Sequence, residues 1–272
     1  MTAFVDALGR TVEVKGQPAR IVSLVPSITQ ALFAFGLGDA IAGVTRFCVD
    51  PPEGVAGKPK VGGTKTLDVE RTLAIGPDLV IANAEENRRE DIERLIAAGL
   101  TVYVTFPRTV ADAIEMMRQL ASMTGAEAAA RPILANAEDE LRHALSLKET
   151  RGAVRVFCPI WRRPWMTIGP DTYMHDFLSV CGAHNVFADS ADRYPRIQLE
   201  QMAARQPEAV LLPDEPYRFA ARHIPELSVF PEVPAVQNER IYLVEGKHLC
   251  WYGPRIAKSL EYVAGLLAGD GA

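Results

Sequence analysis

The sequence predicts an α/β protein of two lobes, each built around a mainly parallel sheet, with a long rigid α-helix joining the lobes. Strand and helix patterns alternate in both halves of the chain, which is typical of parallel sheets covered by helices. About forty residues between the halves show helical periodicity and no strand pattern. We therefore expect an N-terminal lobe at 1–108, a linking helical segment at 109–150 and a C-terminal lobe at 151–272.

A third observation is that one helix–strand unit occurs twice. "LDVERTLAIGPDLVIA" (67–82) aligns with the start of "IQLEQMAARQPEAVLLP" (197–213) over sixteen positions without a gap. Each copy predicts a short helix, a break at a proline and a buried strand. An internal repeat of this kind indicates that the two lobes share one plan. The identical pairs are Glu70 with Glu200, Ala74 with Ala204, Pro77 with Pro207, and Val80 with Val210.

The first elements of the N-terminal lobe are a small hairpin and a buried strand followed by a helix. The hairpin covers 3–14, with its turn near Gly9. The strand at 20–25 should stop at Pro26, and Ser27 can cap the helix that follows. The later elements are a strand at 40–45, a loop at 46–66, the first repeat unit, an amphipathic helix at 86–99 and a strand at 101–106.

The linking segment predicts two helices, the first ending at Gly125 and the second kinked near Pro132. The second helix would be roughly 35 Å long, enough to run across two lobes. Two lobes joined in this way leave a cleft, which is a preferred ligand site. The elements of the C-terminal lobe are a strand at 153–160, a helix at 172–182, a strand at 185–188, the second repeat unit, a strand at 240–246 and a helix at 253–269 that opens near Pro254.

Composition excludes several classes of protein. Apolar residues make up 48% and charged residues 23%, with a net charge of -5, so neither nucleic acid nor an anionic membrane is an expected partner. No apolar stretch reaches the roughly 18 residues of a membrane span. The N-terminus does not read as a signal peptide, because Asp6 and Arg10 interrupt it early. The chain is then either a mature form or a cytosolic protein.

Catalytic and metal-binding motifs are not recognisable in the sequence. Neither G-x-S-x-G nor H-E-x-x-H occurs, and no C-x-x-C pair suggests zinc. The histidines lack metal-ligand spacing, although His248 is kept as a candidate. We therefore expect a protein that is not an enzyme and has no cofactor. The cysteines, expected to be buried free thiols, are Cys48, Cys158, Cys181 and Cys250.

Aromatic and arginine side chains gather after predicted strands. "PIWRRPWMTIG" (159–169), "DRYPR" (192–196) and "KHLCWYGPR" (247–255) hold all three tryptophans, and we expect these segments to be loops. Tryptophan stacks on flat ligand faces and arginine grips carboxylate or phosphate groups. The alternative is that the rings wedge the loops onto the core.

The order of motifs resembles the substrate-binding proteins of ABC importers for cobalamin, haem and ferric siderophores. The resemblance rests on "DALGRTVEVKGQPARIVSLVPSITQALFAFGLGDAIAGVT", on "LDVERTLAIGPDLVIA" and on "LSVCGAHNVFAD", and it covers essentially the whole chain. It implies two α/β lobes bridged by a rigid helix, with the ligand held between them. It also implies a monomer outside the cytoplasm that delivers its ligand to a membrane permease and does not itself insert in the membrane.

The cobalamin-binding members look nearest, and their pattern implies the ligand-binding residues. The set is Trp161, Arg162, Trp165, Tyr194, His248, Trp251, Tyr252 and Arg255. Arg255 has a structural salt bridge as its alternative role. Where those members often carry an aromatic near the first repeat unit, this chain has Thr64, and Thr29-Gln30 replaces their common Thr-Glu. Haem, a siderophore or another corrinoid therefore stays open as ligand.

The resemblance also implies that Glu70 and Glu200 dock onto permease arginines, one glutamate for each half of the permease. The simpler alternative is that each carboxylate complements the dipole of its short helix. Two other functions stay open at this point. One is a cytosolic tetrapyrrole-binding or tetrapyrrole-processing protein on the same scaffold, and the other is a direct binder of zinc or manganese.

Overall fold

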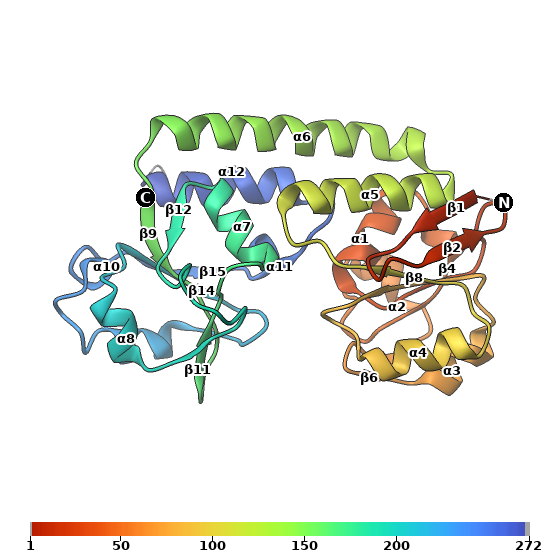
Figure 1. The fold of residues 1–272 in the computed structure, drawn as a ribbon, viewed down its shortest axis with the longest axis horizontal. Helices are drawn as coiled ribbons and strands as arrows, with labels where there is room; N and C mark the ends of the chain where they lie inside the picture. Colours follow the sequence, from red (N-terminus) through yellow and green to blue (C-terminus); the bar gives the residue numbers. More distant parts are fainter. Residues whose placement is uncertain (1, 270–272) are drawn as a thin grey trace. The chain divides into compact units, whose positions relative to one another are not determined.

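The computed structural model describes residues 2–269, which form two compact units (Figure 1). Unit 1 contains the described residues up to Pro107, together with Ala111–Ala135 and Tyr252–Pro254. Unit 2 contains Arg108–Val110, Asn136–Trp251 and the described residues from Arg255 onward. The division falls within the long helix α6, Glu127–Thr150, whose first residues belong to unit 1 and whose last residues belong to unit 2. The expected domain boundaries and interlobe cleft stay predictions.

Unit 1 is built on a four-stranded parallel sheet in the order β4-β3-β7-β8. Both faces of the sheet are covered, with α3 and α4 on one side and α1 and α5 on the other (Figure 1). The N-terminal hairpin β1–β2 joins the edge strand β8 through Ala7, whose N–H donates to the carbonyl of Val104 at 2.9 Å. The elements are β1 Thr2–Val5, β2 Thr11–Val14, β3 Ile21–Ser23, α1 Pro26–Ala34, η1 Gly38–Ala40, β4 Ile41–Val44, α2 Pro52–Ala56, β5 Gly62–Gly63, β6 Thr66–Leu67, α3 Val69–Ile75, β7 Leu79–Asn83, α4 Arg89–Ala97, β8 Val102–Thr105 and α5 Val110–Thr124.

Unit 2 repeats this plan with a parallel sheet in the order β12-β9-β14-β15. In both units the first strand of the sheet lies between the second and the third, and the fourth lies at the edge. The elements after α6 are β9 Val154–Phe157, β10 Pro159–Trp161, β11 Trp165–Thr167, α7 Tyr173–Val180, β12 Ala183–Asn185, β13 Arg196–Ile197, α8 Leu199–Ala204, β14 Ala209–Pro213, η2 Ala221–His223, α9 Ile224–Leu227, α10 Pro234–Gln237, β15 Ile241–Val244, α11 Lys247–Cys250 and α12 Ile256–Ala268.

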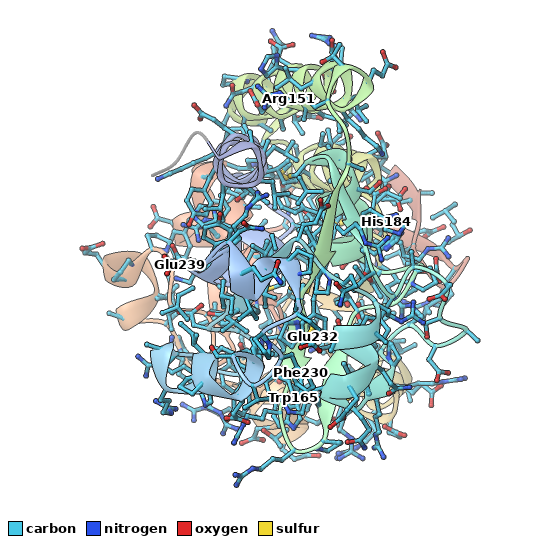
Figure 2. The ribbon with its side chains drawn as sticks, turned by 90° about the vertical axis from the view of Figure 1, so that its left-hand side faces the viewer. Arg151, Trp165, His184, Phe230, Glu232 and Glu239 are labelled. Carbon is cyan, nitrogen blue, oxygen red and sulfur yellow. The ribbon has the colours of Figure 1, made fainter. Side chains whose placement is uncertain are left out.

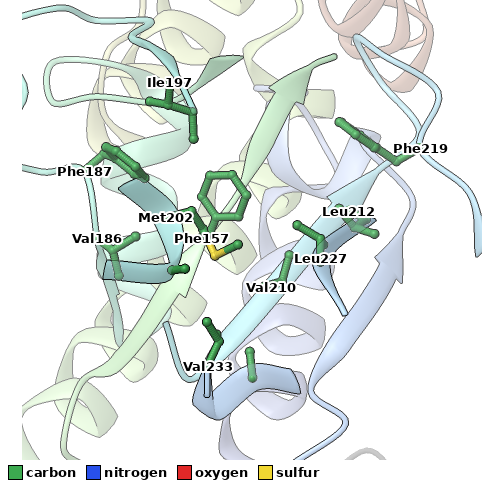
Figure 3. Close-up of a cluster of buried hydrophobic side chains, with 12 residues drawn as sticks. Phe157, Val186, Phe187, Ile197, Met202, Val210, Leu212, Phe219, Leu227 and Val233 are labelled. Carbon is green, nitrogen blue, oxygen red and sulfur yellow. The ribbon is translucent and has the colours of Figure 1, made fainter. Parts of the chain in front are cut away.

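The core of unit 2 lies between its sheet and the short helices that follow the third strand (Figure 3). Phe157 of β9 lies among Val210 and Leu212 of β14, Met202 of α8 and Leu227 of α9, and all of these side chains are essentially inaccessible to solvent. Because parallel strands are buried on both faces, they appear in the sequence as continuous apolar runs. This is why the predicted sheet strands of both units are confirmed.

The two repeat units fold alike, residue for residue. β6, α3 and β7 begin at positions 66, 69 and 79, and β13, α8 and β14 begin at 196, 199 and 209, a constant offset of 130. Asp68 caps α3 by accepting a hydrogen bond from the N–H of Arg71 at 2.9 Å, and Gln198 occupies the same place before α8. After the helices, Gly76 and Gln206 both adopt positive φ, at 63° and 47°. The internal repeat is therefore a repeat of structure.

Five local expectations are wrong. α1 begins at Pro26 with Val25 as its uncapped N-cap, so Ser27 lies inside the helix. The predicted loop at 46–66 contains α2 and the β5–β6 pair, and the strand expected at 185–188 instead ends at Asn185. The segment expected as a loop after β9 is a hairpin, and the last helix begins at Ile256, beyond Pro254. In the first three cases tertiary pairing or packing decided a boundary that local signals left open.

Candidate functional site

Strands β9, β14 and β15 run parallel, so their carboxyl ends meet at one edge of the unit 2 sheet. The segments that follow them are the β10–β11 hairpin, the loop 214–220 and α11 with Trp251. In open α/β sheets, ligands bind outside the carboxyl ends of the strands. Seven of the eight expected ligand-binding residues lie in unit 2 and one, Tyr252, lies in unit 1.

The hairpin presents its two tryptophans on opposite faces. β11 pairs antiparallel with β13, with Trp165 opposite Ile197, and Trp161 of β10 lies opposite Met166. Residues opposite one another in such a ladder share a face, and neighbours along a strand alternate. Trp165 accordingly faces the core with Ile197, whereas Trp161 is 44% exposed.

Sequence reasoning missed a group of rings in the loop after β14. Tyr217 contacts Trp161 edge-on with ring centroids 5.6 Å apart, and Phe219 stacks on Trp165 at 5.6 Å with an interplanar angle of 15°. Tyr217 and Phe219 lie 4.7 Å apart, and His223 packs against both at 5.6 Å. These five side chains are called the ring cluster below. The signal for it was the spacing Tyr-x-Phe after a strand, which no tryptophan marked.

The ring cluster lies at the end of unit 2 away from the termini of its long helices. Figure 2 shows Trp165 beside Phe230, with Arg151 of the α6 end at the opposite extreme. Trp165 and Phe230 both pack on the buried core around Phe157. One tryptophan is therefore largely structural, and the other is presented to solvent.

Arg162 is held by an acid of α9. Its Nε donates to Oε2 of Glu226 at 2.9 Å and its Nη2 lies 2.8 Å from Oε1, a two-point pairing. The pKa of the guanidinium is raised, first because of this hydrogen bond with Glu226. A forked pair of this kind has a fixed geometry. Arg162 therefore fixes the hairpin turn to α9, and any contact with a ligand would use what this pairing leaves free.

A second group surrounds Trp251 and shares the loop after β14 with the ring cluster. Trp251 is buried, and its Nε1 donates to Oε2 of Glu215 at 3.0 Å. Lys247 and Arg255 lie over its ring, at 4.9 Å and 5.9 Å from the centroid. Burial raises the pKa of Glu215 above its ordinary value, and the Trp251 hydrogen bond acts against that rise. Cation–π contacts and this hydrogen bond hold the indole in place.

Arg255 combines both of its expected roles. Its Nη1 lies 3.2 Å from Oε1 of Glu245, so the structural salt bridge exists. Its Nε, however, is buried without a hydrogen-bond partner among the described residues. A buried N–H without a partner is costly, which leaves one donor of this guanidinium available.

His248 turns away from the ring cluster. Its Nδ1 lies 3.0 Å from the hydroxyl of Ser259, and its ring packs on Tyr262 with centroids 4.6 Å apart. Its pKa is lowered, first by burial and then by the neighbouring Arg255. Ser259 and Tyr262 belong to α12, so these contacts fix α11 on α12. His248 is placed by the fold as a packing residue.

Tyr252 belongs to unit 1, where its hydroxyl donates to Oε1 of Glu86 at 2.7 Å. The next residue, Gly253, packs so closely on Ser27 that a Cβ would lie 3.0 Å from the Ser27 carbonyl oxygen. Tyr194, the remaining candidate, is half-buried in unit 2 with the guanidinium of Arg193 5.5 Å from its ring centroid. Neither ring contacts the ring cluster in any aromatic pair of the described residues.

Unit 1 offers one exposed ring that sequence reasoning missed. Phe47, just after β4, is 49% exposed, and the guanidinium of Arg46 lies 5.1 Å from its centroid. A Cβ on Gly63 would lie 3.0 Å from Cε2 of Phe47, so the ring rests against the β5–β6 turn that contains Thr64. Phe47 thus supplies an aromatic side chain beside Thr64.

Glu70 and Glu200 occupy equivalent places in the first turns of α3 and α8. Both are exposed, and Glu70 lies 3.2 Å from Nη2 of Arg94. The N-cap positions themselves are occupied by Asp68 and Gln198. The capping hydrogen bonds are therefore made by other residues, and only the interaction with the helix dipole is left to the glutamates.

The cysteines are free thiols, with Cys48, Cys158 and Cys181 buried as expected and Cys250 partly so. Within residues 2–269, no group of three or more His, Cys, Asp or Glu side chains is arranged to hold a metal ion. No helix of that range is long and apolar enough to cross a membrane.

Comparisons with known proteins agree with this architecture. A vitamin B12-binding protein of Vibrio parahaemolyticus is 28% identical over 228 residues, covering 82% of this chain and 80% of the relative. The solved vitamin B12-binding protein of Vibrio cholerae superposes with a TM-score of 0.82 at 24% identity, covering 92% of this chain and 97% of the other. The apo haem-binding protein of Roseiflexus also gives 0.82, at 24% identity, with 93% and 99% covered.

The family assignment rests on a match over most of the chain. The family model described as "Periplasmic binding protein" matches residues 21–247, which include both sheets, both repeat units and the ring cluster. Members of this family are periplasmic or extracytoplasmic substrate-binding proteins and not enzymes, and their role implies a permease partner and a small-molecule ligand. The chain belongs to the periplasmic binding protein family and is a substrate-binding component of an ABC importer.

Proposed function

We propose that this protein captures cobalamin or a related corrinoid and delivers it to its permease. The observation that carries the proposal is the ring cluster at the carboxyl edge of the unit 2 sheet, with Trp161 44% exposed on it. A half-exposed indole braced by Tyr217 offers a rigid stacking surface for a flat macrocycle. The named vitamin B12-binding relatives support the same ligand class.

The histidines favour a corrinoid over haem. Nδ1 of His223 accepts a hydrogen bond from the N–H of Ala220 at 3.0 Å, so the neutral ring carries its proton on Nε2. A metal ligand needs a lone pair on the nitrogen that faces the metal. The ring cluster is therefore suited to a complex whose metal already carries its axial ligands, as the cobalt of cobalamin does. The metal complex would be cargo, and we propose no resident cofactor.

The remaining ligand-binding candidates are assigned by how free their contacting atoms are. Trp161 and the unpaired Nε of Arg255 are the strongest, and Phe47 of unit 1 is added to them. Arg162, Trp165, Trp251 and Tyr252 would shape the site through the contacts that hold them, and Tyr194 would flank it. His248 would contribute only through the position of α11.

The ligand is tested by titrating the purified protein with cyanocobalamin, haemin and a ferric siderophore, followed by calorimetry and tryptophan emission. We expect cyanocobalamin to bind most tightly and to quench emission, and Trp161→Ala to weaken it by roughly 1–3 kcal/mol. Leu145→Ala is the matched control, because Leu145 is similarly exposed, at 41%, on α6. Preferential binding of haemin would replace the corrinoid by haem, and equal binding by the two variants would remove the ring cluster from the site.

We also propose that Glu70 and Glu200 dock onto the permease from outside the cytoplasm, with the protein acting as a monomer. Exposed ion pairs of this kind set orientation and encounter rate and weaken as salt rises. The double variant Glu70→Gln and Glu200→Gln should bind cyanocobalamin normally and fail to support uptake. Glu53→Gln is the control, because Glu53 is an exposed acid in the first turn of α2. Normal uptake by the double variant would refute docking through these residues.

A further inference from the structure

A second pocket lies at the amino edge of the unit 2 sheet, the edge opposite to the ring cluster. It has a volume of about 450 Å³ and is lined by the last turns of α6 and α12 and by the turn after α7. Val154 begins β9 and Arg240 directly precedes β15, so the lining residues come before their strands. A volume in this range accommodates a small organic molecule.

The charged side chains that line this pocket are all cations, among the residues that the structure describes. They are Lys148, Arg151 and Arg240, beside the apolar side chains of Leu147, Val154 and Leu267. Nζ of Lys148 donates to the hydroxyl of Ser179 at 2.8 Å, and Nη2 of Arg240 donates to the carbonyl of Leu267 at 2.6 Å. Both of these partners are neutral, so they leave the positive charges uncompensated.

The ordinary explanation for cations here is the convergence of helix C-termini. α6, α7 and α12 all end at the pocket. A helix end carries about half a negative charge, so three ends supply about -1.5 against three full positive charges. The lining keeps an excess of about +1.5 on this reckoning, which the helix ends alone do not explain.

One acid approaches without lining the pocket. Glu140 lies one turn before Ala144 on α6, and its charge raises the pKa of the buried Cys181, which does line the pocket; burial is the larger cause of that rise. Its charge would reduce the excess without removing it. Glu140 therefore provides a way to test the electrostatics without touching a lining side chain.

We propose that this pocket binds a small organic anion, a phosphate or carboxylate attached to an apolar body. The cations would hold the anionic group at the rim, and the leucine and valine side chains would contact the body. Since this site lies at the other edge of the sheet, it does not depend on the ligand of the ring cluster.

The test uses phenyl phosphate as the probe, with inorganic phosphate and phenol as its separate parts, in calorimetric titrations of the full chain at low salt. We expect saturable binding of phenyl phosphate at least about ten-fold tighter than of either part, weakening as salt rises. Lys148→Ala and Arg151→Ala should each weaken it several-fold, and Glu140→Gln should tighten it. Arg142→Ala, which removes an exposed cation of the same helix outside the pocket, should leave it unchanged.

Circular dichroism and urea unfolding establish that each variant is folded. Absence of saturable phenyl phosphate binding by the folded wild type would overturn the proposal. An equal loss in Arg142→Ala would also overturn it, because the binding would then reflect the charge of the surface in general. Cyanocobalamin affinity should be the same in all these variants, which separates this site from the proposed importer function.

Discussion

Trp161 and Trp165 should behave oppositely when each is replaced by alanine. Trp165 packs on the core and stacks on Phe219, so its loss should resemble removal of a buried ring. Such truncations cost about 3–5 kcal/mol when the ring is fully buried, and Trp165 is only partly buried, so we expect about 2–3 kcal/mol of destabilisation. Trp161 is 44% exposed with one edge contact, so its loss should cost about 1 kcal/mol.

Ligand affinity should follow the reverse order. Trp161→Ala removes a stacking surface that is already solvent-exposed, and Trp165→Ala removes a ring that faces inward. Urea unfolding by circular dichroism measures stability, and calorimetry with cyanocobalamin measures affinity on the folded variants. Trp165→Phe is the control, because it keeps a ring against Phe219. If Trp161→Ala were the less stable variant and Trp165→Ala, while folded, the weaker binder, the assignment of the two hairpin faces would be wrong.

Three further predictions concern other contacts. Arg20→Ala and Arg155→Ala should each destabilise the protein by about 1–2 kcal/mol in urea unfolding, because each side chain donates to two carbonyls at a helix end. Burial lowers the folded pKa of His248, so stability should fall as pH drops below about 6.5, where the unfolded chain binds the proton first; unfolding midpoints of His248→Gln should vary less over pH 5–7. Arg255→Ala should weaken cyanocobalamin binding by calorimetry more than it lowers the melting temperature, and the reverse order would leave only the Glu245 salt bridge.

Much of the fold could be predicted because its strands are short apolar runs separated by helices. The gap-free repeat even carried the bounds of β7 onto β14. The hairpin around Trp161 could not be predicted, because its turn lacks the Asn-Gly or Gly signature that marks tight hairpins. Arg163 instead takes a φ of 64° there, a conformation that local sequence does not announce for arginine.

The candidate site was predicted in part, because tryptophans and arginines mark it in the sequence but their directions do not. Trp165 and Trp161 were expected to act alike, yet the strand register places them on opposite faces. Tyr217 and Phe219 were missed because a ring cluster depends on which loops meet, and that is decided by the order of strands in the sheet. His248 was an open candidate that α12 claims through Ser259.

The two units also share a contact that the repeat alone does not contain. In unit 1, Arg20 precedes the first sheet strand, and its side chain donates to the carbonyls of Ile75 and Gly76 at the end of α3. Asp78 accepts from the Arg20 N–H at 3.1 Å, and its own N–H donates to the Arg20 carbonyl at 3.1 Å. This contact, the arginine clamp, ties the end of the repeat helix to the sheet.

Unit 2 makes the arginine clamp with different neighbours in sequence. Arg155 donates to the carbonyls of Arg205 and Gln206 at the end of α8. Glu208 accepts from the Arg155 N–H at 2.8 Å and donates to the Arg155 carbonyl at 2.7 Å. The arginines are 135 positions apart and the acids 130, so no gap-free alignment could reveal the correspondence.

The arginine clamp explains how two exposed glutamates keep equivalent places. Each lies in the first turn of a short helix, α3 or α8, whose last carbonyls are held by the arginine of the first strand. A helix of two turns is marginal by itself, so its position depends on such tertiary contacts. Glu70 and Glu200 are thus placed alike relative to their own sheets by duplicated contacts at the opposite helix end. Loosening one clamp, as in Arg155→Ala, should impair uptake through Glu200 while cyanocobalamin still binds, and full uptake by a variant whose α8 is shown to be mobile would contradict this link.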